Sequence, residues 1–444
     1  LLQTLRDRSD PVAGVDGLRL TPGLQTKYPQ VLTTEALEFV CALYRDMKPH
    51  LRQVLEQRRI DREFLDAQTQ RCAVANQTIS FDSADYQTPI GHTDDQGRLV
   101  VGPHQQIEHG PRVQIPDFLV GDQITLFGPP DSAKMTINAM NALHRQLPGE
   151  DPLVARLVKD SGHVPRWGAD SEDSKTPMAR DLRMASRNLK GCFDGTLTYD
   201  DPRNGKHYSL ADDGLALPVK RIPGLALPDG DHILDGAPLP LHLVELVQHI
   251  WINRSCEQAR VIYFPKLENE EEAAYLASVI DAAERAVKRR YPDYPLQTVR
   301  VILVFENPRA IFRIREMGEA LYPSFLGGSL GWHDFLASTA RLFRHDPDYR
   351  IPVKADPDIV IRNIRESHAI LVRDLGESGA LKIGGMYGIL YQSGDIESFA
   401  ACMVGYIRDV VTQLKRGLDG FWVAHPDFVR IGIALVEAWR QQQA

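Results

Sequence analysis

From about residue 115 onwards, short apolar segments alternate regularly with amphipathic segments that have helical spacing. An alternation of this kind predicts βαβ units whose strands run parallel. Seven or eight such units favour a closed barrel over an open doubly wound sheet, and no GxGxxG follows the first expected strand. We therefore expect an α/β protein of the (β/α)8 TIM-barrel class, with an N-terminal helical segment and inserted loops.

The same patterns give the expected element and domain boundaries. Strands are expected at 123–130, 164–173, 216–224, 259–268 and 299–308, and more weakly at 326–334, 380–386 and 420–427. Helices are expected at 33–65, from Ser132, at 270–291, from about Ala310 and at 357–375. The predicted domains are an N-terminal helical and irregular segment at 1–114, the barrel at 115–430 with an insertion at 143–163, and the start of a C-terminal helical region at 431–444.

Charge and cysteine content exclude several classes of function. The net charge of -8 and the pI near 6.0 provide no basic field for nucleic acid or for an anionic membrane surface. The five cysteines show no zinc-ligand spacing and no disulfide framework. No signal peptide or membrane-spanning apolar stretch is recognisable, so we expect a soluble protein of the cytoplasm. The chain opens on Leu1 rather than methionine, so its ends need not be the natural ones, and its oligomeric state cannot be read from the sequence.

Polar residues follow the expected strands at the ends that form one rim of such a barrel, where catalytic residues of this fold lie. They are Asp170, Glu172, Asp173, Arg221, Lys266, Glu268, Glu306, Asp334 and His425. Grouped carboxylates suit a hard divalent ion such as Mg²⁺, and further acids can hold its water ligands. An arginine beside the metal can stabilise an oxyanion or enolate. The alternative is a set of rim salt bridges between neighbouring loops, and the set as a whole favours a functional site.

Other residue types near these acids allow two interpretations. His333 and His425 could act as acid or base, but neither has a partner identifiable from sequence, so a structural role is favoured. Three tryptophans are expected to wall the pocket: Trp167, Trp332 and Trp422. A group in the polar 75–112 stretch lacks ligand spacing and is interpreted as solvated loop: His92, Asp94 and Asp95.

Several of these segments together resemble the malate synthases, particularly the shorter isoform. The matching stretches are LTTEALEFVCAL, ITLFGPPDSAKMTINAMNA, GADSEDSKTP, VKRIPG with LPDGDHILDG, YFPKLEN, LVFENPRAIFRIREM, LGWHDF, IGGM and DGFWVAHPDFV. They follow one another in the order of the family. The resemblance implies a TIM barrel, a Mg²⁺ cofactor, the substrates acetyl-CoA and glyoxylate, and a place in the glyoxylate cycle.

The resemblance also implies roles for individual residues. Glu306 and Asp334 match the family's two Mg²⁺-binding carboxylates, and Glu172 with Asp173 matches the acidic pair that holds the metal's waters. Arg221 matches the arginine that contacts glyoxylate and stabilises the enolate of acetyl-CoA. The LGWHDF stretch places three residues at the substrate: Gly331, Trp332 and His333. The implied reaction is a Claisen condensation followed by hydrolysis of the malyl thioester, which gives malate and CoA.

The sequence departs from the family pattern in three places. Trp332 and His333 stand where the family usually has arginine and tryptophan, Pro223 replaces the second arginine of an RPRG stretch, and the 143–163 segment is longer than its counterpart. The family's catalytic aspartate lies in a C-terminal domain beyond the segment matching WVAHPDF, and no residue up to Ala444 matches it. Two alternatives therefore stay open: a related Mg²⁺-dependent acyl-CoA/2-oxo acid aldolase or lyase with a different substrate, and a non-catalytic descendant that lacks the base.

Overall fold

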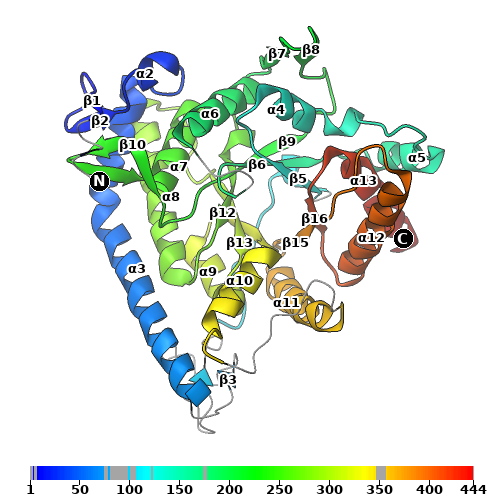
Figure 1. The fold of residues 1–444 in the computed structure, drawn as a ribbon. Helices are drawn as coiled ribbons and strands as arrows, with labels where there is room; N and C mark the ends of the chain where they lie inside the picture. Colours follow the sequence, from blue (N-terminus) through cyan, green and yellow to red (C-terminus); the bar gives the residue numbers. More distant parts are fainter. Residues whose placement is uncertain are drawn as a thin grey trace.

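A closed barrel of eight parallel strands forms the centre of the protein (Figure 1). The computed structural model describes residues 4, 8–74, 79–80, 99–100, 107–121, 124–173, 178–346 and 357–443. In spatial order the barrel strands are β5 (Thr125–Gly128), β6 (Arg166–Asp170), β9 (Leu217–Arg221), β12 (Val261–Pro265), β13 (Arg300–Phe305), β14 (Phe325–Leu330), β15 (Leu381–Tyr387) and β16 (Gly420–Val423), which pairs again with β5. The predicted (β/α)8 barrel is thus confirmed.

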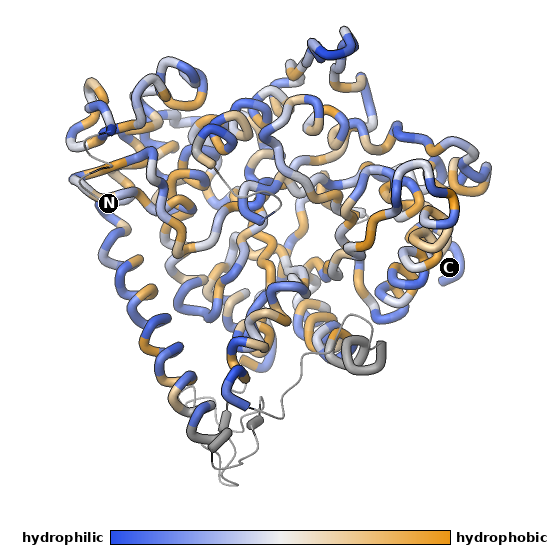
Figure 2. Tube along the Cα trace, viewed as in Figure 1, coloured by the Kyte–Doolittle hydropathy of each residue, from blue (hydrophilic) through white to orange (hydrophobic). Residues whose placement is uncertain are grey.

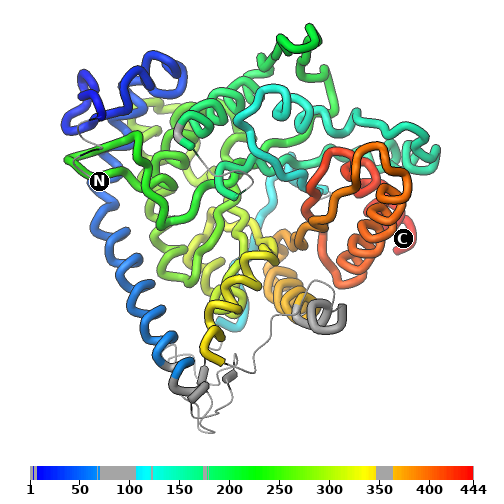
Figure 3. Tube along the Cα trace, viewed as in Figure 1, coloured from blue at the N-terminus to red at the C-terminus, as the bar shows by residue number. Residues whose placement is uncertain are grey.

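Helices cover the outside of the barrel. They are α4 (Ala133–Met140), α5 (Pro152–Ser161), α6 (Ala179–Phe193), α7 (Leu241–Ile252), α8 (Glu270–Arg290), α9 (Ile314–Leu321), α10 (Trp332–Leu342), α11 (Pro357–Glu377), α12 (Ile396–Lys415) and α13 (Val429–Gln443). Short 3-10 turns lie between elements: η1 (Asp117–Leu119), η2 (Ala142–His144), η3 (Gln258–Arg260), η4 (Ala310–Phe312) and η5 (Pro426–Phe428). Figure 3 shows the first and last segments of the chain on opposite sides of the barrel.

The barrel strands are apolar because they are buried on both sides. Five of the six residues of β13 are buried, and β6, β9 and β12 are buried along their whole length. Branched and aromatic side chains fill the interior, among them Val219, Tyr263, Ile302 and Trp422. Hydrophobic residues are accordingly visible along the central strands in Figure 2. Continuous burial explains why the sequence shows apolar runs here instead of alternation.

Helix α8 illustrates how local sequence sets the helix ends. The Asn269 side chain caps it by accepting a hydrogen bond from the backbone N–H of Glu272, 2.9 Å away. Its first turn is acidic and its last turn, Lys288 to Arg290, is basic, which complements the helix dipole. Arg289 and Arg290 are exposed, and this local basic cluster is a solvated helix end.

The N-terminal segment is attached to the barrel by a helix and a sheet. Helix α3 (Thr34–Val74) runs along one edge of the molecule and packs on α7 and α8 (Figure 1). Before it come β1 (Asp10–Pro11), β2 (Leu18–Leu20) and the short α2 (Leu24–Lys27). The first two strands join a hairpin between β9 and α7, β10 (Pro228–Leu234) and β11 (Ala237–Pro240), in the order β1-β2-β10-β11. The sequence patterns did not predict this antiparallel sheet.

Two further strand pairs are small. The antiparallel pair of β7 (Thr198–Asp200) and β8 (His207–Ser209) follows α6, and β3 (Ile79–Ser80) pairs with β4 (Leu99–Val100). The polar residues His92, Asp94 and Asp95 lie outside the described residues. Among the residues that are described, no helix combines the length and the apolar composition needed to cross a membrane.

The predicted insertion at 143–163 contains α5. Asp151 caps this helix by accepting from the backbone N–H of Leu153, 2.8 Å away. The helix packs on α13, and Arg430 of α13 makes a two-pronged contact with Glu150, with its Nη2 2.6 Å from Oε1 and its Nε 2.7 Å from Oε2. The 143–163 segment is therefore held against α13, the last helix, on the outside of the barrel.

A fully buried charged cluster lies behind strand β9. Glu245 on α7 accepts hydrogen bonds from Lys220 on β9, 2.6 Å away, and from Arg183 on α6, 2.7 Å away. Arg183 also contacts Asp229 on β10 at 3.4 Å and donates to Gln248 at 2.9 Å. All five side chains are buried. Because Lys220 is adjacent to Arg221, this cluster fixes the strand that ends in the site arginine.

Candidate active site

The carboxyl ends of five neighbouring barrel strands bring charged side chains together. Asp170 and Arg221 are the last residues of β6 and β9, Lys266 and Glu306 directly follow β12 and β13, and Asp334 lies in the first turn of α10 after β14. Glu172 and Asp173 follow two and three residues after β6 ends. The parallel barrel thus gathers residues that are far apart in sequence, as the strand-end pattern predicted.

Arg221 lies at the centre of this group and is buried. Its Nη2 is 3.0 Å from Oε1 of Glu306 and 2.6 Å from Oε2 of Glu172, while Nη1 is 3.4 Å from Oδ2 of Asp170. Its guanidinium carbon lies 5.8 Å from the centre of the Trp422 ring. The planar guanidinium therefore bridges the acids of β6 and β13, which a single ammonium group cannot do with the same geometry.

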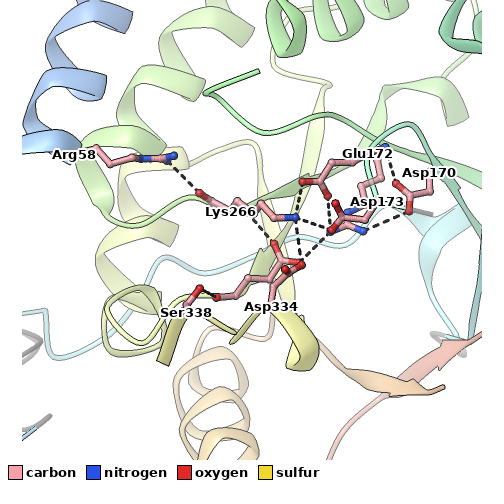
Figure 4. A network of polar contacts seen from close by, with 9 residues as sticks. Arg58, Asp170, Glu172, Asp173, Lys266, Asp334 and Ser338 are labelled. Atoms are coloured by element: carbon pink, nitrogen blue, oxygen red, sulfur yellow. Dashed lines mark hydrogen bonds and ion pairs between the residues drawn. The ribbon is translucent and has the colours of Figure 1, made fainter. Parts of the chain in front are cut away.

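Lys266 is a second cation within the same acidic group (Figure 4). Its Nζ lies 2.6 Å from Glu172, 2.6 Å from Asp173 and 3.2 Å from Asp334. Its backbone N–H donates to Oε2 of Glu306 at 3.0 Å, and its φ of 59° is in the left-handed region. A residue with a side chain adopts this conformation at a cost, so the surrounding contacts must hold it there.

Asp173, Glu306 and Asp334 form a set of possible metal ligands. One carboxylate oxygen from each lies within 4.8 Å of the others. With Asp170 and Glu172, five carboxylates face two cations, which leaves excess negative charge for a divalent ion. The Lys266 ammonium already contacts two of the three candidate ligands, so the position attracts positive charge. Hard carboxylate oxygens in this number fit Mg²⁺, and the grouping adds Asp173 to the predicted ligand pair.

A cavity of about 510 Å³ opens beside the acids. Its lining includes Glu172, Asp173, Lys266, Glu306 and Asp334, together with residues of α3 and α10. Arg58 of α3 joins these parts: its Nη2 donates to the backbone carbonyl of Lys266 at 3.1 Å, and its guanidinium contacts both carboxylate oxygens of Glu272 at 2.6 Å. The N-terminal helix is thus part of the cavity wall.

Burial changes the pKa values of the two glutamates. Desolvation raises the pKa of Glu306 well above its usual range, because it outweighs the charges of Arg221 and Lys266. For the same reason the pKa of Glu172 rises to about 7. At Asp173 burial acts in the same direction, but the hydrogen bond with Lys266 and the nearby cations together lower its pKa. In the metal-free protein the two buried acids therefore resist ionisation.

The raised pKa of Glu172 predicts a pH-dependent stability. Between its ordinary value of 4.5 and about 7, the folded protein binds a proton that the unfolded chain does not. The contribution is fully present below pH 4.5 and is lost as the pH rises through 7, a change of about 3 kcal/mol. We expect Glu172→Gln to reduce the slope in urea unfolding with EDTA between pH 5 and 8, while the part that is due to Glu306 remains. Glu271→Gln, at an exposed position, should keep the full slope, and an unchanged slope in Glu172→Gln would contradict the assignment.

Gly331 allows the close approach of Glu306 to the start of α10. A Cβ at this position would lie 2.2 Å from Cγ and 2.6 Å from Oε1 of Glu306. Glu306 is already held by Arg221 and by the backbone of Lys266, so it cannot move aside freely. Gly331 thus shapes the site through backbone packing, although the resemblance implied substrate contact.

We expect Gly331→Ala to displace Glu306. The overpacking should lower the free energy of unfolding by about 1–3 kcal/mol and weaken Mn²⁺ binding about tenfold or more, measured by electron paramagnetic resonance. Gly230→Ala is the matched control, because no atom lies within 4 Å of the added methyl group. Equal behaviour of the two variants would show that Gly331 has no packing role at the site.

The structure places the other predicted residues as follows. Trp332 packs partly buried against the main core, and His333 is exposed with its ring 3.6 Å from the Cβ position of Gly388. In the described chain neither lines the cavity, which includes Asp334. His425 accepts from the backbone N–H of Asp427 at 3.3 Å and lies beside Tyr391. Its capping contact agrees with the structural role favoured from sequence.

The residues that line the cavity differ from those expected from the sequence, and the described lining contains none of the three tryptophans. Trp167 and Trp422 are buried in the apolar clusters around and inside the barrel, and of these two only Trp422 approaches a site residue, Arg221. Arg58 and the bridging position of Lys266 were not predicted. Lys266 itself was among the predicted strand-end residues because it follows an apolar strand, whereas the contact of Arg58 with residues more than 200 positions away left no local pattern.

Comparisons with known proteins give consistent matches. Residues 218–443 match the family model for the malate synthase TIM-barrel domain, and residues 17–70 match that for the malate synthase N-terminal domain. A malate synthase of Oryza sativa subsp. japonica is 24% identical over 421 residues, which cover 93% of this chain and 65% of that protein. A malate synthase of Streptomyces clavuligerus is 27% identical over 417 residues, which cover 92% of this chain and 68% of that protein.

A structural comparison finds the Haloferax volcanii malate synthase magnesium/glyoxylate complex. Its TM-score is 0.43 at 14% identity, with 73% of this chain and 76% of that chain covered. The chain spans about two thirds of the length of the curated relatives that it matches. The barrel-domain match covers half of the chain and includes the strand ends that supply Arg221, Lys266, Glu306 and Asp334, so this chain belongs to the malate synthase family.

Proposed function

We propose that this protein catalyses a malate-synthase-type Claisen condensation, in which acetyl-CoA, glyoxylate and water give malate and free CoA. The observation that supports the proposal most is the position of Arg221. Its guanidinium touches Glu306 and Glu172 next to three carboxylates that can share one divalent ion. A fixed cation and a metal-binding set in one cavity suit a reaction that develops negative charge on a carbonyl oxygen.

Different residues would bind the metal ion and stabilise the negative charge that develops in the reaction. Asp173, Glu306 and Asp334 would hold Mg²⁺, with Glu172 beside them. When bound, Mg²⁺ would polarise the aldehyde oxygen of glyoxylate. Arg221 donates hydrogen bonds toward the same region and stabilises the enolate oxygen of the thioester. Lys266 holds Glu172 and Asp173 in place through contacts of 2.6 Å each. The resemblance places the base for the methyl proton beyond the matched segments, and no residue here is given that role.

The test is the release of free CoA from acetyl-CoA on the longest native chain. We expect release that depends on both glyoxylate and Mg²⁺, followed with a thiol reagent, and malate identified as the product by NMR. Glu306→Gln should lose this turnover, while Glu271→Gln on the exposed first turn of α8 should keep it. Absence of glyoxylate-dependent CoA release in the wild-type protein would overturn the proposal.

A second candidate is a related Mg²⁺-dependent acyl-CoA/2-oxo acid aldolase or lyase. It is favoured by Trp332 and His333, which replace the family's usual arginine and tryptophan directly before Asp334. A panel of 2-oxo acids with several acyl-CoAs separates the two. A larger 2-oxo acid with higher kcat/KM than glyoxylate, or a thioester that is cleaved without hydrolysis, would select this second reaction.

A further inference from the structure

Helix α12 presents a row of apolar side chains to solvent. Ile396 is 79%, Val404 49% and Ile407 38% exposed. Ala400 is exposed and Val411 half-buried, which completes a row spaced by three or four residues. At 3.6 residues per turn this spacing forms one stripe. The helix has a separate buried face, so the stripe takes no part in packing among the residues that the structure describes.

The loop before α12 exposes two further apolar side chains. Ile389 is 51% and Leu390 53% exposed. Sγ of Cys402 donates to the backbone carbonyl of Ile389 at 3.2 Å, so the loop lies beside the second turn of the helix. Figure 1 shows α12 at the periphery of the molecule next to α13. A row of exposed apolar side chains such as the one on α12 marks an interaction site.

Two charges flank the stripe on the same side. Glu397 and Arg408 are both exposed and are eleven residues apart, which places them roughly 20° from one another around the helix axis. In the part of the chain that the structure describes, neither has an ion-pair partner. The flank is therefore acidic near the start of the helix and basic near its end, where Lys415 is also exposed.

We propose that a second copy of this chain docks on α12, with the two helices antiparallel about a two-fold axis near Val404. Because side chains on the same flank meet in such a pair, Glu397 faces Arg408 of the partner subunit, and the contact occurs twice by symmetry. Along the stripe, Ile396 lies opposite Val411 of the partner subunit. A parallel pair would instead place the two charged flanks on opposite sides of the interface, so this charge contact would not form. The interface is independent of the catalytic proposal.

Sedimentation velocity of the purified chain from 1 to 100 µM tests this surface. We expect a monomer–dimer equilibrium in the wild-type protein and monomer only in Val404→Asp. Glu397→Arg and Arg408→Glu should each raise the dimer dissociation constant about tenfold or more, because each puts like charges opposite one another. The double variant with both changes should return to within about threefold of wild type. Glu271→Arg, exposed on α8, is the control that should leave dimerisation unchanged, and circular dichroism checks the fold of each variant.

The double variant that exchanges the two charges is the decisive test of the proposal. Recovery in the double variant requires that the two residues face each other across copies, which another partner or a lipid surface would not reproduce. A wild-type chain that stays monomeric at 100 µM would overturn the proposal. So would a dimer that is insensitive to Val404→Asp, or a double variant that adds the two losses. Binding of the monomer to anionic vesicles without dimerisation would assign the surface to a membrane instead.

Discussion

Arg221→Lys is expected to lower kcat for CoA release by about 100- to 1,000-fold, the usual loss when one pre-positioned donor to a developing oxyanion is removed. Lysine keeps the charge but has a single ammonium group. It cannot reach the acids of β6 and β13 together, as Nη1 and Nη2 of Arg221 do at 3.4 Å and 3.0 Å. Because the charge balance of the site is kept, the fold and the affinity for Mn²⁺ should change little.

Separate measurement of kcat, KM and Mn²⁺ binding identifies the role of Arg221. A catalytic role predicts a fall in kcat with Mn²⁺ affinity within about threefold of wild type. Arg365→Lys on α11, where the side chain is 57% exposed, serves as the conservative control. If Arg221→Lys raises only KM, Arg221 contributes to ground-state binding and the enolate role is wrong.

Glu245→Gln is expected to lower the free energy of unfolding by about 3–5 kcal/mol, because it removes one charge from a fully buried ion-pair cluster. Arg183 would keep Asp229 as an acidic partner, whereas Lys220 would lose the ion pair that it makes among the described residues, and burial already lowers the pKa of Lys220. Urea unfolding monitored by circular dichroism measures the loss. The effect should also reach the active site, because Lys220 and Arg221 are consecutive residues of β9.

A double variant separates unpaired charge from altered shape. Adding Lys220→Met to Glu245→Gln removes one charge of each sign, so it should recover part of the lost stability. The exposed substitution Glu271→Gln controls for general effects of charge removal. Strictly additive losses in the double variant, or a loss below about 1 kcal/mol in Glu245→Gln, would show that the cluster is not held by charge pairing.

The barrel could be predicted because its strands are buried on both faces and leave continuous apolar runs. Each of the eight expected strands overlaps an observed barrel strand, including the weaker expectation at 420–427, where β16 covers Gly420–Val423. The acids at the strand ends were also found, because parallel strands place their carboxyl ends on one rim. The β1-β2-β10-β11 sheet escaped prediction, since β10 reads PDGDHIL and its partners are two to four residues long.

The finer geometry of the site depends on tertiary contacts that have no local pattern. The grouping of Asp173 with Glu306 and Asp334 requires the turn after β6 to bend toward β13. Lys266 enters the acidic group because its backbone adopts a φ of 59°, a conformation that residue type alone does not indicate. The residues that form the cation-binding region were therefore visible in the sequence, but their mutual arrangement was not.

The sheet that joins β2 to β10 has a consequence for folding during synthesis on the ribosome. Leu20 pairs with His232, so roughly 200 further residues must be synthesised before β2 can pair with β10. At about 5–20 residues per second, this delay is roughly 10–40 s. During that interval Leu18 and Leu20, both buried in the finished protein, are exposed to water on an open strand edge. Slow codons between these positions would lengthen the exposure, and a chaperone bound to the segment around Leu18 and Leu20 would shield it.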